Sequence, residues 1–423
     1  MGQAHQGRRD SGSIAMTDSK RSGPLAGVRV LDLTSIILGP FATQMMADLG
    51  ADVIKVESPV GDTIRQVGPM RNPGMGAIYL HLNRNKRSVV LDLKTEEGRE
   101  ACLHLVREVD VLLYNVRPQS MARMGLSYEA VSAVNPKIVY VGAYGFGNEG
   151  PYAGKPAYDD LIQGMTGVAR LYERSSGHEP RYAPLTLADR TIGLQAAIAC
   201  LAGVIHSRAT GTGQSIEVPM FEGMAQMILG DHLGQRTFDE DAPADGMGYP
   251  RLLSEHRKPY QTQDGYVSAL IYNDRHWQQF MAAIDRADLM TDSIFSTHSR
   301  RAENIGDVYR FVDEVLRTRS TAEWLALFDA NDIPCAPLYA IEDLPTDPHL
   351  KATGHLIKTD HPSEGDVHTI APLGRYSATP LGVYRHAPTL GEHTEELVDS
   401  LPMDSEKKQV VLNAARRAVG GRK

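Results

Sequence analysis

Residues 28–57 constrain the fold more than any other part of the chain. A strand-like apolar run at 28–34 is followed by Gly39-Pro40, which opens a predicted helix over 41–49. A second strand-like run covers 51–57. Proline suits the first turn of a helix because its missing amide hydrogen is not needed there. Strand, helix and strand in this order predict a βαβ unit, and therefore a parallel sheet with a right-handed crossover.

The same alternation continues along the chain. A chain of 423 residues exceeds what one core usually serves, so two domains, or one large α/β domain with a smaller insertion, are expected. A hairpin over 260–271, with Asp264-Gly265 as its turn, begins a second region of α+β character. Further strands are predicted at 86–93, 110–115, 137–144 and 214–219, and helices at 95–109, 127–134, 159–171, 220–234, 275–284, 305–317, 321–331 and from 405 onward.

The bulk properties exclude several classes of protein. A net charge of -8 with scattered basic residues favours no nucleic-acid partner. The longest apolar run, 194–205, is interrupted and predicts a buried helix, so no membrane span is expected. Cys102, Cys200 and Cys335 are few and far apart, which indicates reduced thiols in a cytoplasmic protein and no metal cluster. Residues 1–23 lack the apolar core of a signal peptide and are expected to be a disordered leader, with Met16 as an alternative start.

Familiar catalytic motifs are missing from the sequence. It contains no H-E-x-x-H, paired C-x-x-C, G-x-S-x-G or phosphate-binding P-loop, and the 15 histidines are dispersed. The run Gly145-Phe-Gly-Asn-Glu-Gly150 matches the dinucleotide pattern, but Pro151 follows where a helix should begin. We therefore predict a loop there, which can still line a site.

Asp189 is the most informative carboxylate. Apolar residues lead into it, and the apolar run 194–205 follows it. One interpretation is a helix N-cap, in which the side chain accepts amides of the first turn. The other is a nucleophilic carboxylate, held near helix-terminal amides while apolar flanks exclude water. Spacing alone leaves both open.

Several short motifs, in their order and spacing, carry a family resemblance. The sequence from Pro24 to about Val398 resembles the class III CoA-transferases, a family that includes formyl-CoA, carnitine and succinyl-CoA:glutarate CoA-transferases, with alpha-methylacyl-CoA racemase as a relative. The motifs are Gly27-Val-Arg-Val-Leu-Asp-Leu-Thr34, Gly39-Pro40, Leu49-Gly-Ala-Asp-Val-Ile-Lys-Val-Glu57, Asn83-Arg-Asn-Lys-Arg-Ser88, Gly145-Phe-Gly-Asn-Glu-Gly-Pro151, Tyr158-Asp159, Gly211-Thr-Gly-Gln214 and Leu390-Gly-Glu-His-Thr394.

The resemblance implies an enzyme of the EC 2.8.3 type with Asp189 as nucleophile. Asp189 would attack an acyl-CoA thioester, take up CoA as an aspartyl-CoA thioester, and pass it to an acceptor carboxylate. Coenzyme A and acyl-CoA are then substrates, and no permanently bound cofactor or metal is implied. Asp159 falls near the nucleophile and is expected to assist it, with plain solvent exposure as the alternative. The CoA contacts would fall on Ser35, Ile37, Leu38, Leu91, Asn115, Val116, Arg123, Met124, Lys155 and Tyr158.

The resemblance also implies the architecture. It predicts a Rossmann-like large domain with a parallel sheet, formed by residues 24–235 and 335–423 with their linkers. A smaller α+β domain, residues 236–334, would be inserted between these parts. Two copies would form an interlocked homodimer. Periodicity alone predicts only the parallel sheet and the second α+β region.

Two alternative functions stay open. A racemase-like epimerase needs an acid and a base at the substrate alpha carbon, and Tyr158 stands where the racemase has a His. A non-catalytic acyl-CoA binding protein would use Asp189 only structurally. For a transferase, Arg71, Arg84 and Arg181 would suit a dicarboxylate such as succinate, with surface placement as the alternative. Residues 253–256 show no glycine run like that of the formyl-CoA member, which favours another subtype.

Overall fold

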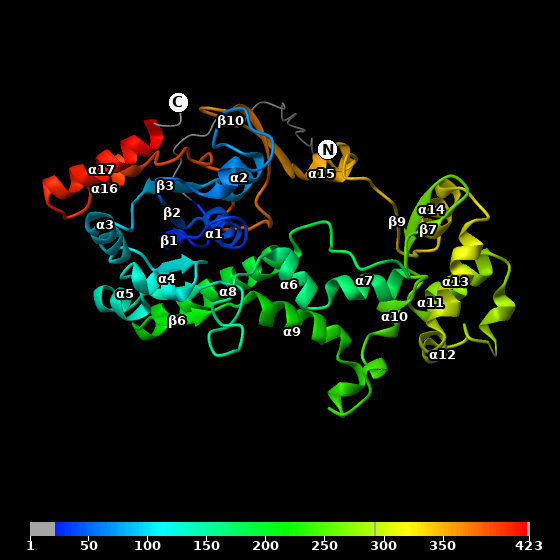
Figure 1. Cartoon of the computed structure of the whole chain (residues 1–423). Helices are drawn as coiled ribbons and strands as arrows, with labels where there is room; N and C mark the ends of the chain where they lie inside the picture. The colour runs from blue at the N-terminus through cyan, green and yellow to red at the C-terminus, as the bar shows by residue number, and fades with distance from the viewer. Residues whose placement is uncertain (1–21, 292, 421–423) are drawn as a thin grey trace. The chain divides into compact units, whose positions relative to one another are not determined.

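A computed structural model describes residues 22–291 and 293–420 (Figure 1). The chain divides into two compact units, which we describe separately. The predicted leader, residues 1–23, lies almost entirely outside the described residues, and the domain limits near 236 and 334 stay a prediction. The first unit comprises the described residues of Met1–Ile162, Leu185–Met224 and Pro348–Lys423, and the second comprises those of Gln163–Pro184 and Ala225–Asp347.

A six-stranded parallel sheet forms the centre of the first unit. Its spatial order is β3-β2-β1-β4-β5-β6, and every neighbouring pair is parallel, which confirms the predicted parallel sheet. The order reverses direction between β1 and β4, so the loops that follow these two strands diverge and leave a crevice. The strands are β1 (Arg29–Leu33), β2 (Asp52–Glu57), β3 (Lys86–Val90), β4 (Val111–Tyr114), β5 (Val139–Gly142) and β6 (Gln214–Glu217).

Helices cover both faces of this sheet. On one face, α1 (Leu38–Asp48) and α8 (Leu187–Thr210) pack against each other and against the strands. On the opposite face, alternate strand residues such as Leu31, Ile54 and Leu112 join an apolar core with the remaining helices. Those helices are α3 (Glu96–Val106), α5 (Tyr128–Val134), α16 (Thr394–Asp399) and α17 (Ser405–Gly420).

Local sequence explains where these helices begin and end. The Thr95 hydroxyl accepts the Gly98 amide at 3.1 Å and caps α3, and Ser127 caps α5 in the same way. Gly211, with φ of 77°, ends α8 in the left-handed conformation that glycine adopts without strain. The predicted single helix over 159–171 is wrong. Gly167 takes φ of 84° and separates α6 (Asp159–Met165) from α7 (Val168–Ser176).

The remaining elements of the first unit surround these layers. β10 (Leu356–His361) and β11 (Gly365–Ile370) form an antiparallel hairpin. The predicted helix at 220–234 is α9 (Met220–His232), which begins in this unit. The other pieces are the 3-10 turn η1 (Thr63–Gln66) and the short helices α2 (Ala77–Asn83), α4 (Pro118–Arg123) and α15 (Pro348–Thr353).

A layer of charged side chains is buried among β1, β2, β3 and α1. Lys86 Nζ lies 3.1 Å from the Asp32 carboxylate, and both side chains are fully buried. Burial alone would raise the pKa of Asp32, but the charges of Lys86 and Lys55, with hydrogen bonds from Thr34 and Thr43, lower it to about 2. Lys55 Nζ in turn lies 2.9 Å from the buried carboxylate of Asp62.

A second group in the same layer centres on Glu57. Arg65 donates to both of its carboxylate oxygens, at 2.7 and 2.6 Å, and Ser88 donates at 2.7 Å. Burial would raise the pKa of Glu57, yet Arg65, Lys55 and Ser88 together lower it to about 2. We call these six side chains the charged layer: Asp32, Lys55, Glu57, Asp62, Arg65 and Lys86.

The second unit contains a three-stranded antiparallel sheet packed against helices. The predicted hairpin turn at Asp264-Gly265 joins β7 (Tyr260–Gln261) to β8 (Tyr266–Ala269). The sequence assigns residues 335–337 to the large domain, but in the structure they form β9 (Cys335–Pro337), which pairs with β8 of this unit. Trp277 and Trp324 lie in the apolar core of this unit. The helices wholly within this unit are α7, α10 (Pro250–Leu253), α11 (Asp274–Ala283), α12 (His298–Glu303), α13 (Ile305–Leu316) and α14 (Thr321–Ala330), with the 3-10 turns η2 (Gly234–Thr237), η3 (Ala244–Gly246), η4 (Ala287–Met290) and η5 (Leu344–Thr346).

Helix α8 differs from its prediction in one respect. Across residues 22–291 and 293–420, it is the one helix whose length and composition would suffice to cross a bilayer, and 44% of its most apolar window is buried. The sequence predicts a buried helix here. The structure instead exposes Leu194, Ile198 and Ile205 along one side of α8, at 48%, 64% and 70% of their surface.

Candidate active site

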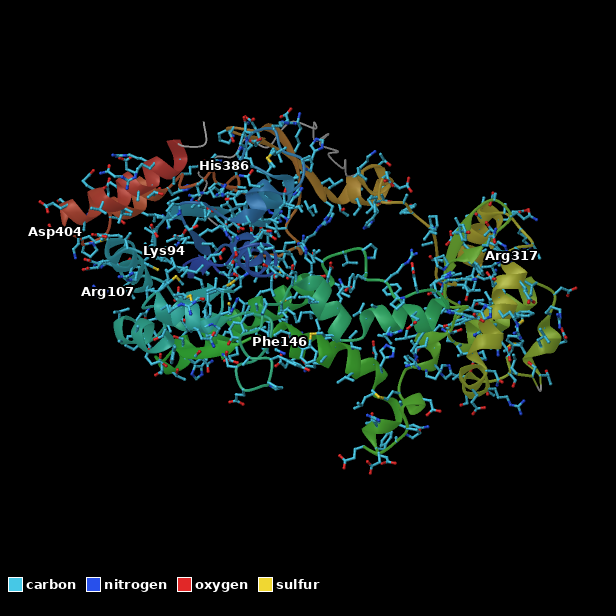
Figure 2. The ribbon with its side chains drawn as sticks, in the orientation of Figure 1. Lys94, Arg107, Phe146, Arg317, His386 and Asp404 are labelled. Atoms are coloured by element: carbon cyan, nitrogen blue, oxygen red, sulfur yellow. The ribbon has the colours of Figure 1, made fainter. Side chains whose placement is uncertain are left out.

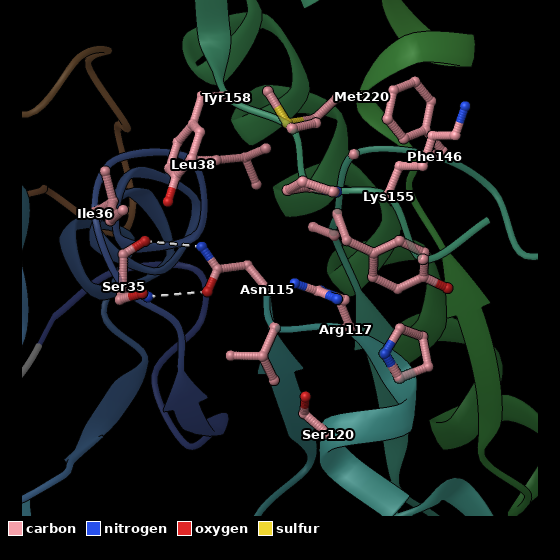
Figure 3. A pocket seen from close by; sticks show the side chains of 18 of the residues that line it. Ser35, Ile36, Leu38, Asn115, Arg117, Ser120, Phe146, Lys155, Tyr158 and Met220 are labelled. Carbon is pink, nitrogen blue, oxygen red and sulfur yellow. Dashed lines mark hydrogen bonds between the residues drawn. The ribbon is translucent and has the colours of Figure 1, made fainter. Parts of the chain in front are cut away.

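A cavity of about 440 Å³ opens at the carboxyl ends of β1, β4 and β5 (Figure 3). This is the point where the strand order reverses, and ligands of open α/β sheets bind in such crevices. Its walls come from the loops after these strands, from the loop before α6, and from the starts of α8 and α9. The lining residues are Ser35–Leu38, Asn115–Pro118, Ser120, Arg123, Ala143–Phe146, Asn148, Gly154–Tyr158, Asp189 and Met220.

The loop between β1 and α1 is held in an unusual backbone conformation. Asn115 accepts the Ser35 amide at 3.0 Å and donates to the Ser35 carbonyl at 2.8 Å, so one side chain fixes both groups (Figure 3). Ile36 takes φ of 71°, which is rare for a β-branched residue, and its amide donates to Asp62 at 3.0 Å. Because Asp62 is paired with buried Lys55, the charged layer helps to set the shape of this wall.

The N-terminus of α1 borders the cavity. No side chain caps it at Ile37. Within the described part of the chain, the amides of Ile37, Leu38 and Gly39 have no hydrogen-bond acceptor. The aligned peptides of a helix concentrate partial positive charge at such an end. Ile37 and Leu38 line the cavity together with Asp189, so this charge faces the space in front of the carboxylate.

Asp189 is the third residue of α8, and the N-cap interpretation is therefore wrong. Thr186 occupies the N-cap position without a side-chain hydrogen bond. The Asp189 amide, one of the unpaired donors of the first turn, donates to Asp159 Oδ1 at 2.9 Å. Asp159 thus satisfies this end of α8, and the Asp189 side chain is left to face the cavity. None of the described residues donates a hydrogen bond to the Asp189 carboxylate.

A close helix contact positions Asp189 beside α1. Gly193, one turn further along α8, leaves no room for a side chain. A Cβ atom there would lie 2.9 Å from the Leu38 carbonyl oxygen and from the Phe41 ring. The Arg190 guanidinium stacks 4.5 Å from the centroid of the same ring. These contacts fix the position of Asp189 relative to the N-terminus of α1.

The environment of Asp189 raises its pKa from 3.8 to about 7. Burial is the largest cause, because removing water destabilises the ionised form, and the nearby charge of Asp159 adds to it. Arg190 opposes both effects. A carboxylate that ionises near neutral pH inside a cavity is poorly solvated, and such perturbed groups concentrate at functional sites.

Three cations line the cavity without a carboxylate partner among the described residues: Arg117, Arg123 and Lys155. Arg123 donates only to the Ser120 hydroxyl, at 2.9 Å, and Lys155 Nζ lies 4.5 Å from the Tyr152 ring centroid. Their remaining donors are open to a ligand, and guanidinium groups suit phosphate oxygens. In the described residues, no cluster of three or more His, Cys, Asp or Glu side chains could hold a metal ion.

The structure brings most of the predicted site residues together. Two do not reach the cavity: Leu91 is 1% exposed within the apolar core, and Met124 packs against that core. Asp159 is 9% exposed and lies behind Asp189, so the alternative of plain solvent exposure is wrong. The predicted residues that line the cavity are Ser35, Ile37, Leu38, Asn115, Val116, Arg123, Lys155, Tyr158 and Asp189.

The arginines considered for an acceptor acid have different surroundings. Arg84 is 7% exposed and donates to both carboxylate oxygens of Asp48, at 3.1 and 2.6 Å, so it is neither a surface residue nor free for a substrate. Arg71 donates to the Glu364 carbonyl. Arg181, in the second unit, is exposed and lies 3.2 Å from Glu179.

Sequence reasoning missed several lining residues. Arg117 lies three residues after the end of β4, and its place in the loop that follows a strand could have identified it. Phe146 (Figure 2) belongs to the loop predicted at 145–150, which does line the cavity, although this residue was not singled out. Its ring packs against Tyr152 and Phe221, with ring centroids 5.3 and 5.8 Å apart. Ile36 and Met220 had no usable signal, because one depends on backbone strain and the other on the start of a distant helix.

Comparison with known proteins shows the family of the chain. The model of "CoA-transferase family III" matches residues 25–394. The chain belongs to CoA-transferase family III. This confirms the resemblance drawn from the short motifs, and with it an enzyme of the class III CoA-transferase type.

Individual relatives extend over nearly the whole chain. The succinate–glutarate CoA-transferase of Agrobacterium fabrum is 32% identical over 91% of this chain and 98% of its own length. The formyl-CoA:oxalate CoA-transferase of Shigella sonnei is 31% identical over 90% of this chain and 96% of its own. A crystal structure of a CAIB/BAIF family protein from Brucella suis matches with a TM-score of 0.73 and 31% identity, and covers 89% of this chain and 98% of that one.

Proposed function

We propose that this CoA-transferase moves CoA from an acyl-CoA thioester to a carboxylic acid through an aspartyl-CoA thioester on Asp189. The observation that carries the proposal is the state of the Asp189 carboxylate. It is largely buried, it has no hydrogen-bond donor among the described residues, and it lines the same cavity as unpaired helix amides and three cations. Such a carboxylate is a better nucleophile than a solvated or ion-paired one.

The proposed cycle balances without a proton, a metal or ATP. The ionised Asp189 oxygen attacks the thioester carbonyl, the carbon–sulfur bond breaks, and a mixed anhydride and CoA thiolate result. The thiolate attacks the aspartyl carbonyl, which releases the donor acid and leaves aspartyl-CoA. An acceptor carboxylate attacks that thioester in turn, and the returning thiolate takes the new acyl group and frees Asp189. Over the whole cycle one thioester is exchanged for another, so the overall reaction is nearly balanced in energy, although the anhydrides lie higher than the thioesters on either side of them.

The surrounding groups support this chemistry in two ways. The unpaired amides at the start of α1 are candidate donors to the oxyanions that form during each attack. The charged layer holds their loop through Asp62, so these donors do not need to reorganise during the reaction. Asp159 fixes the backbone of Asp189 and raises its pKa, which makes the carboxylate a stronger nucleophile once ionised.

The CoA moiety is assigned to the cations of the cavity. Arg117, Arg123 and Lys155 can neutralise its phosphates, because none is paired with a described carboxylate. Loops at the carboxyl ends of β1 and β4 are where an open sheet binds nucleotide-like ligands. Ser35, Asn115 and Tyr158 add polar groups along the same wall.

The substrate acids are proposed to be short dicarboxylates, with succinyl-CoA as the acyl donor. The support is that two relatives covering nearly the whole chain are named for succinate with glutarate and for formyl-CoA with oxalate. Racemisation is disfavoured, because Tyr158 stands where the resemblance places a His in the racemase, and a phenol is not the acid–base group that an imidazole is.

Self-association is part of the proposal. α8 exposes Leu194, Ile198 and Ile205 on one side, and exposed apolar rows of this kind mark contact surfaces. A second copy of the chain, in the interlocked arrangement implied by the family, would cover them. The three free cysteines support a reducing, cytoplasmic compartment. Light scattering after gel filtration tests the assembly, and a monomeric mass would contradict it.

A donor and acceptor screen tests the function. The protein is incubated with succinyl-, glutaryl-, oxalyl- and formyl-CoA against a panel of mono- and dicarboxylic acids, and CoA products are identified by mass spectrometry. We expect exchange for at least one dicarboxylate pair, and none for Asp189→Ala, which should still bind CoA. If wild type and variant both bind CoA and neither transfers it, the protein is a binding protein and the proposal is wrong.

A further inference from the structure

A second cavity is lined entirely by residues of the smaller unit. It measures about 150 Å³ and is enclosed by α10, α11, α12, α13 and the residues after β8. Five of the residues that line it carry aromatic rings, namely Tyr249, Tyr272, Trp277, His298 and Tyr309. A cavity of about 150 Å³ with apolar walls accepts a molecule the size of benzene. Its dimensions therefore suit a single small ring or an equivalent aliphatic group.

The charge in this cavity comes from two arginines with different surroundings. Arg301 is 3% exposed and satisfied, because it donates to the Phe295 carbonyl at 2.6 Å and to the Asp274 carboxylate. Arg251 is half-buried and donates through Nε to the Tyr309 hydroxyl at 2.8 Å. No carboxylate of the described residues forms an ion pair with Arg251, so its guanidinium keeps donors for an external anion.

The aromatic lining and the Arg251 guanidinium would contact different parts of one ligand. Arg251 lies at the cavity with its guanidinium carbon 6.0 Å from the Tyr272 ring centroid, and Trp277, only 3% exposed, forms part of the inner wall. Leu270 and Ile271 add aliphatic surface. A guanidinium pairs with a carboxylate through two parallel hydrogen bonds, whereas the rings favour a flat apolar body. A neutral or cationic molecule would leave Arg251 uncompensated.

We propose that this cavity binds a small organic acid, with its carboxylate on Arg251 and a ring-sized apolar body against Trp277 and Tyr272. The site goes beyond the proposed transfer reaction and does not depend on it. It would let the smaller unit hold an acid of a kind different from the short dicarboxylates assigned to Asp189.

Tryptophan fluorescence provides a direct test with the full-length protein. The chain has two tryptophans, and Trp277 lines the cavity while Trp324 lies in the apolar core. Benzoate is the probe, hexanoate tests an aliphatic body, and benzamide is the uncharged control of the same shape. We expect saturable quenching by benzoate, weaker quenching by hexanoate, none by benzamide, and no saturable change in Trp277→Phe.

Matched variants locate the anion site. Arg251→Gln should weaken benzoate binding by about 10- to 100-fold, the effect of losing a charged hydrogen-bond pair. Arg310→Gln, an exposed arginine of the same helix as Tyr309 that pairs with Asp307, should bind benzoate as wild type does. If Arg251→Gln does not fold, Arg251→Lys keeps the charge without the paired donors and should still bind more weakly than wild type.

Three outcomes would overturn the proposal. One is the absence of saturable benzoate binding, and a second is equal affinity for benzamide. The third is weakened benzoate binding in Arg123→Gln with unchanged binding in Arg251→Gln, which would place the probe in the cavity of Asp189. Because the readout is binding and not transfer, failure of the proposed function would leave this test unaffected.

Discussion

The charged layer and the Asp189 cavity place carboxylates in opposite environments within one unit. In the charged layer, Asp32 lies 3.1 Å from Lys86 and Glu57 lies 2.6 Å from Arg65, and both carboxyl pKa values are about 2. Asp189 forms no ion pair among the described residues, lies next to Asp159, and has a pKa of about 7. Burial raises the pKa of all three carboxyl groups, so the difference between their pKa values comes from the charged groups and hydrogen bonds around each one.

The contrast separates a structural carboxylate from a reactive one. A buried carboxylate that is paired with a cation is held in its ionised form and has little reason to react. A buried carboxylate beside another carboxylate is destabilised when ionised, and attack on a substrate relieves this. The loop at Ile36 connects the two regions, because Asp62 of the charged layer holds the wall that faces Asp189.

Asp189→Asn should have the largest effect on transfer. Asparagine keeps the size but cannot form the anhydride, so the rate should fall by more than about 1,000-fold, as expected for loss of a covalent nucleophile. The melting temperature should stay the same or rise, because an unfavourable buried charge is removed. CoA-exchange rates and thermal unfolding of the same preparation check both parts. A variant that loses stability but keeps its transfer activity would contradict the assignment of Asp189 as the nucleophile.

Asp32→Asn should show the opposite pattern. It leaves Lys86 buried without its counter-charge, which costs about 3–5 kcal/mol of unfolding free energy. Denaturant unfolding measures this loss, with the exposed Asp307→Asn as the control. At a temperature where the variant is folded, transfer should be reduced far less than in Asp189→Asn. A fully stable Asp32→Asn protein would contradict the structural role of the charged layer.

Arg123→Gln sharpens the comparison on the ligand side. Arg123 has no carboxylate partner among the described residues, so its loss should leave stability unchanged and raise KM for acyl-CoA. Loss of a charged hydrogen bond of about 1.5–3 kcal/mol corresponds to roughly 10- to 100-fold. Steady-state kinetics with Arg107→Gln, an exposed arginine outside the cavity (Figure 2), serves as the control. An unchanged KM would remove Arg123 from the phosphate site.

The pH dependence of the unfolding free energy should also differ between wild type and Asp189→Asn. The pKa of Asp189 is higher in the folded protein than its ordinary value, so its contribution is favourable below about pH 4 and is lost as pH rises toward 7. Asp32 has a lowered pKa, and its contribution is lost as pH falls from about 4 to about 2. Between pH 4 and pH 8, the free energy of unfolding should fall less steeply in Asp189→Asn than in wild type. Identical slopes would show that Asp189 ionises normally.

Much of the fold could be predicted from the sequence, because it depends on local patterns. Apolar runs such as 28–34 and 51–57 correspond to β1 and β2, and the intervening Gly39-Pro40 lies in the first turn of α1. The break at Gly167 was missed, because glycine within a helical pattern does not by itself predict a left-handed backbone.

The site was harder to predict, because its chemistry depends on residues that are distant in sequence. Asp189 and Asp159 are 30 positions apart, and their contact decides both the backbone geometry and the pKa of the nucleophile. The basic run at 83–88 resembles a solvated segment, yet Arg84 and Lys86 are buried against Asp48 and Asp32. Only the folded chain shows which carboxylates have cations beside them.

Covalent trapping at Asp189 tests the central claim most directly. The protein is incubated with succinyl-CoA without an acceptor acid, treated with hydroxylamine or borohydride, digested, and analysed by mass spectrometry. We predict a modified peptide in which the change maps to Asp189, and an unmodified peptide from Asp189→Asn. An enzyme that exchanges CoA at full rate while its Asp189 peptide stays unmodified would contradict the account.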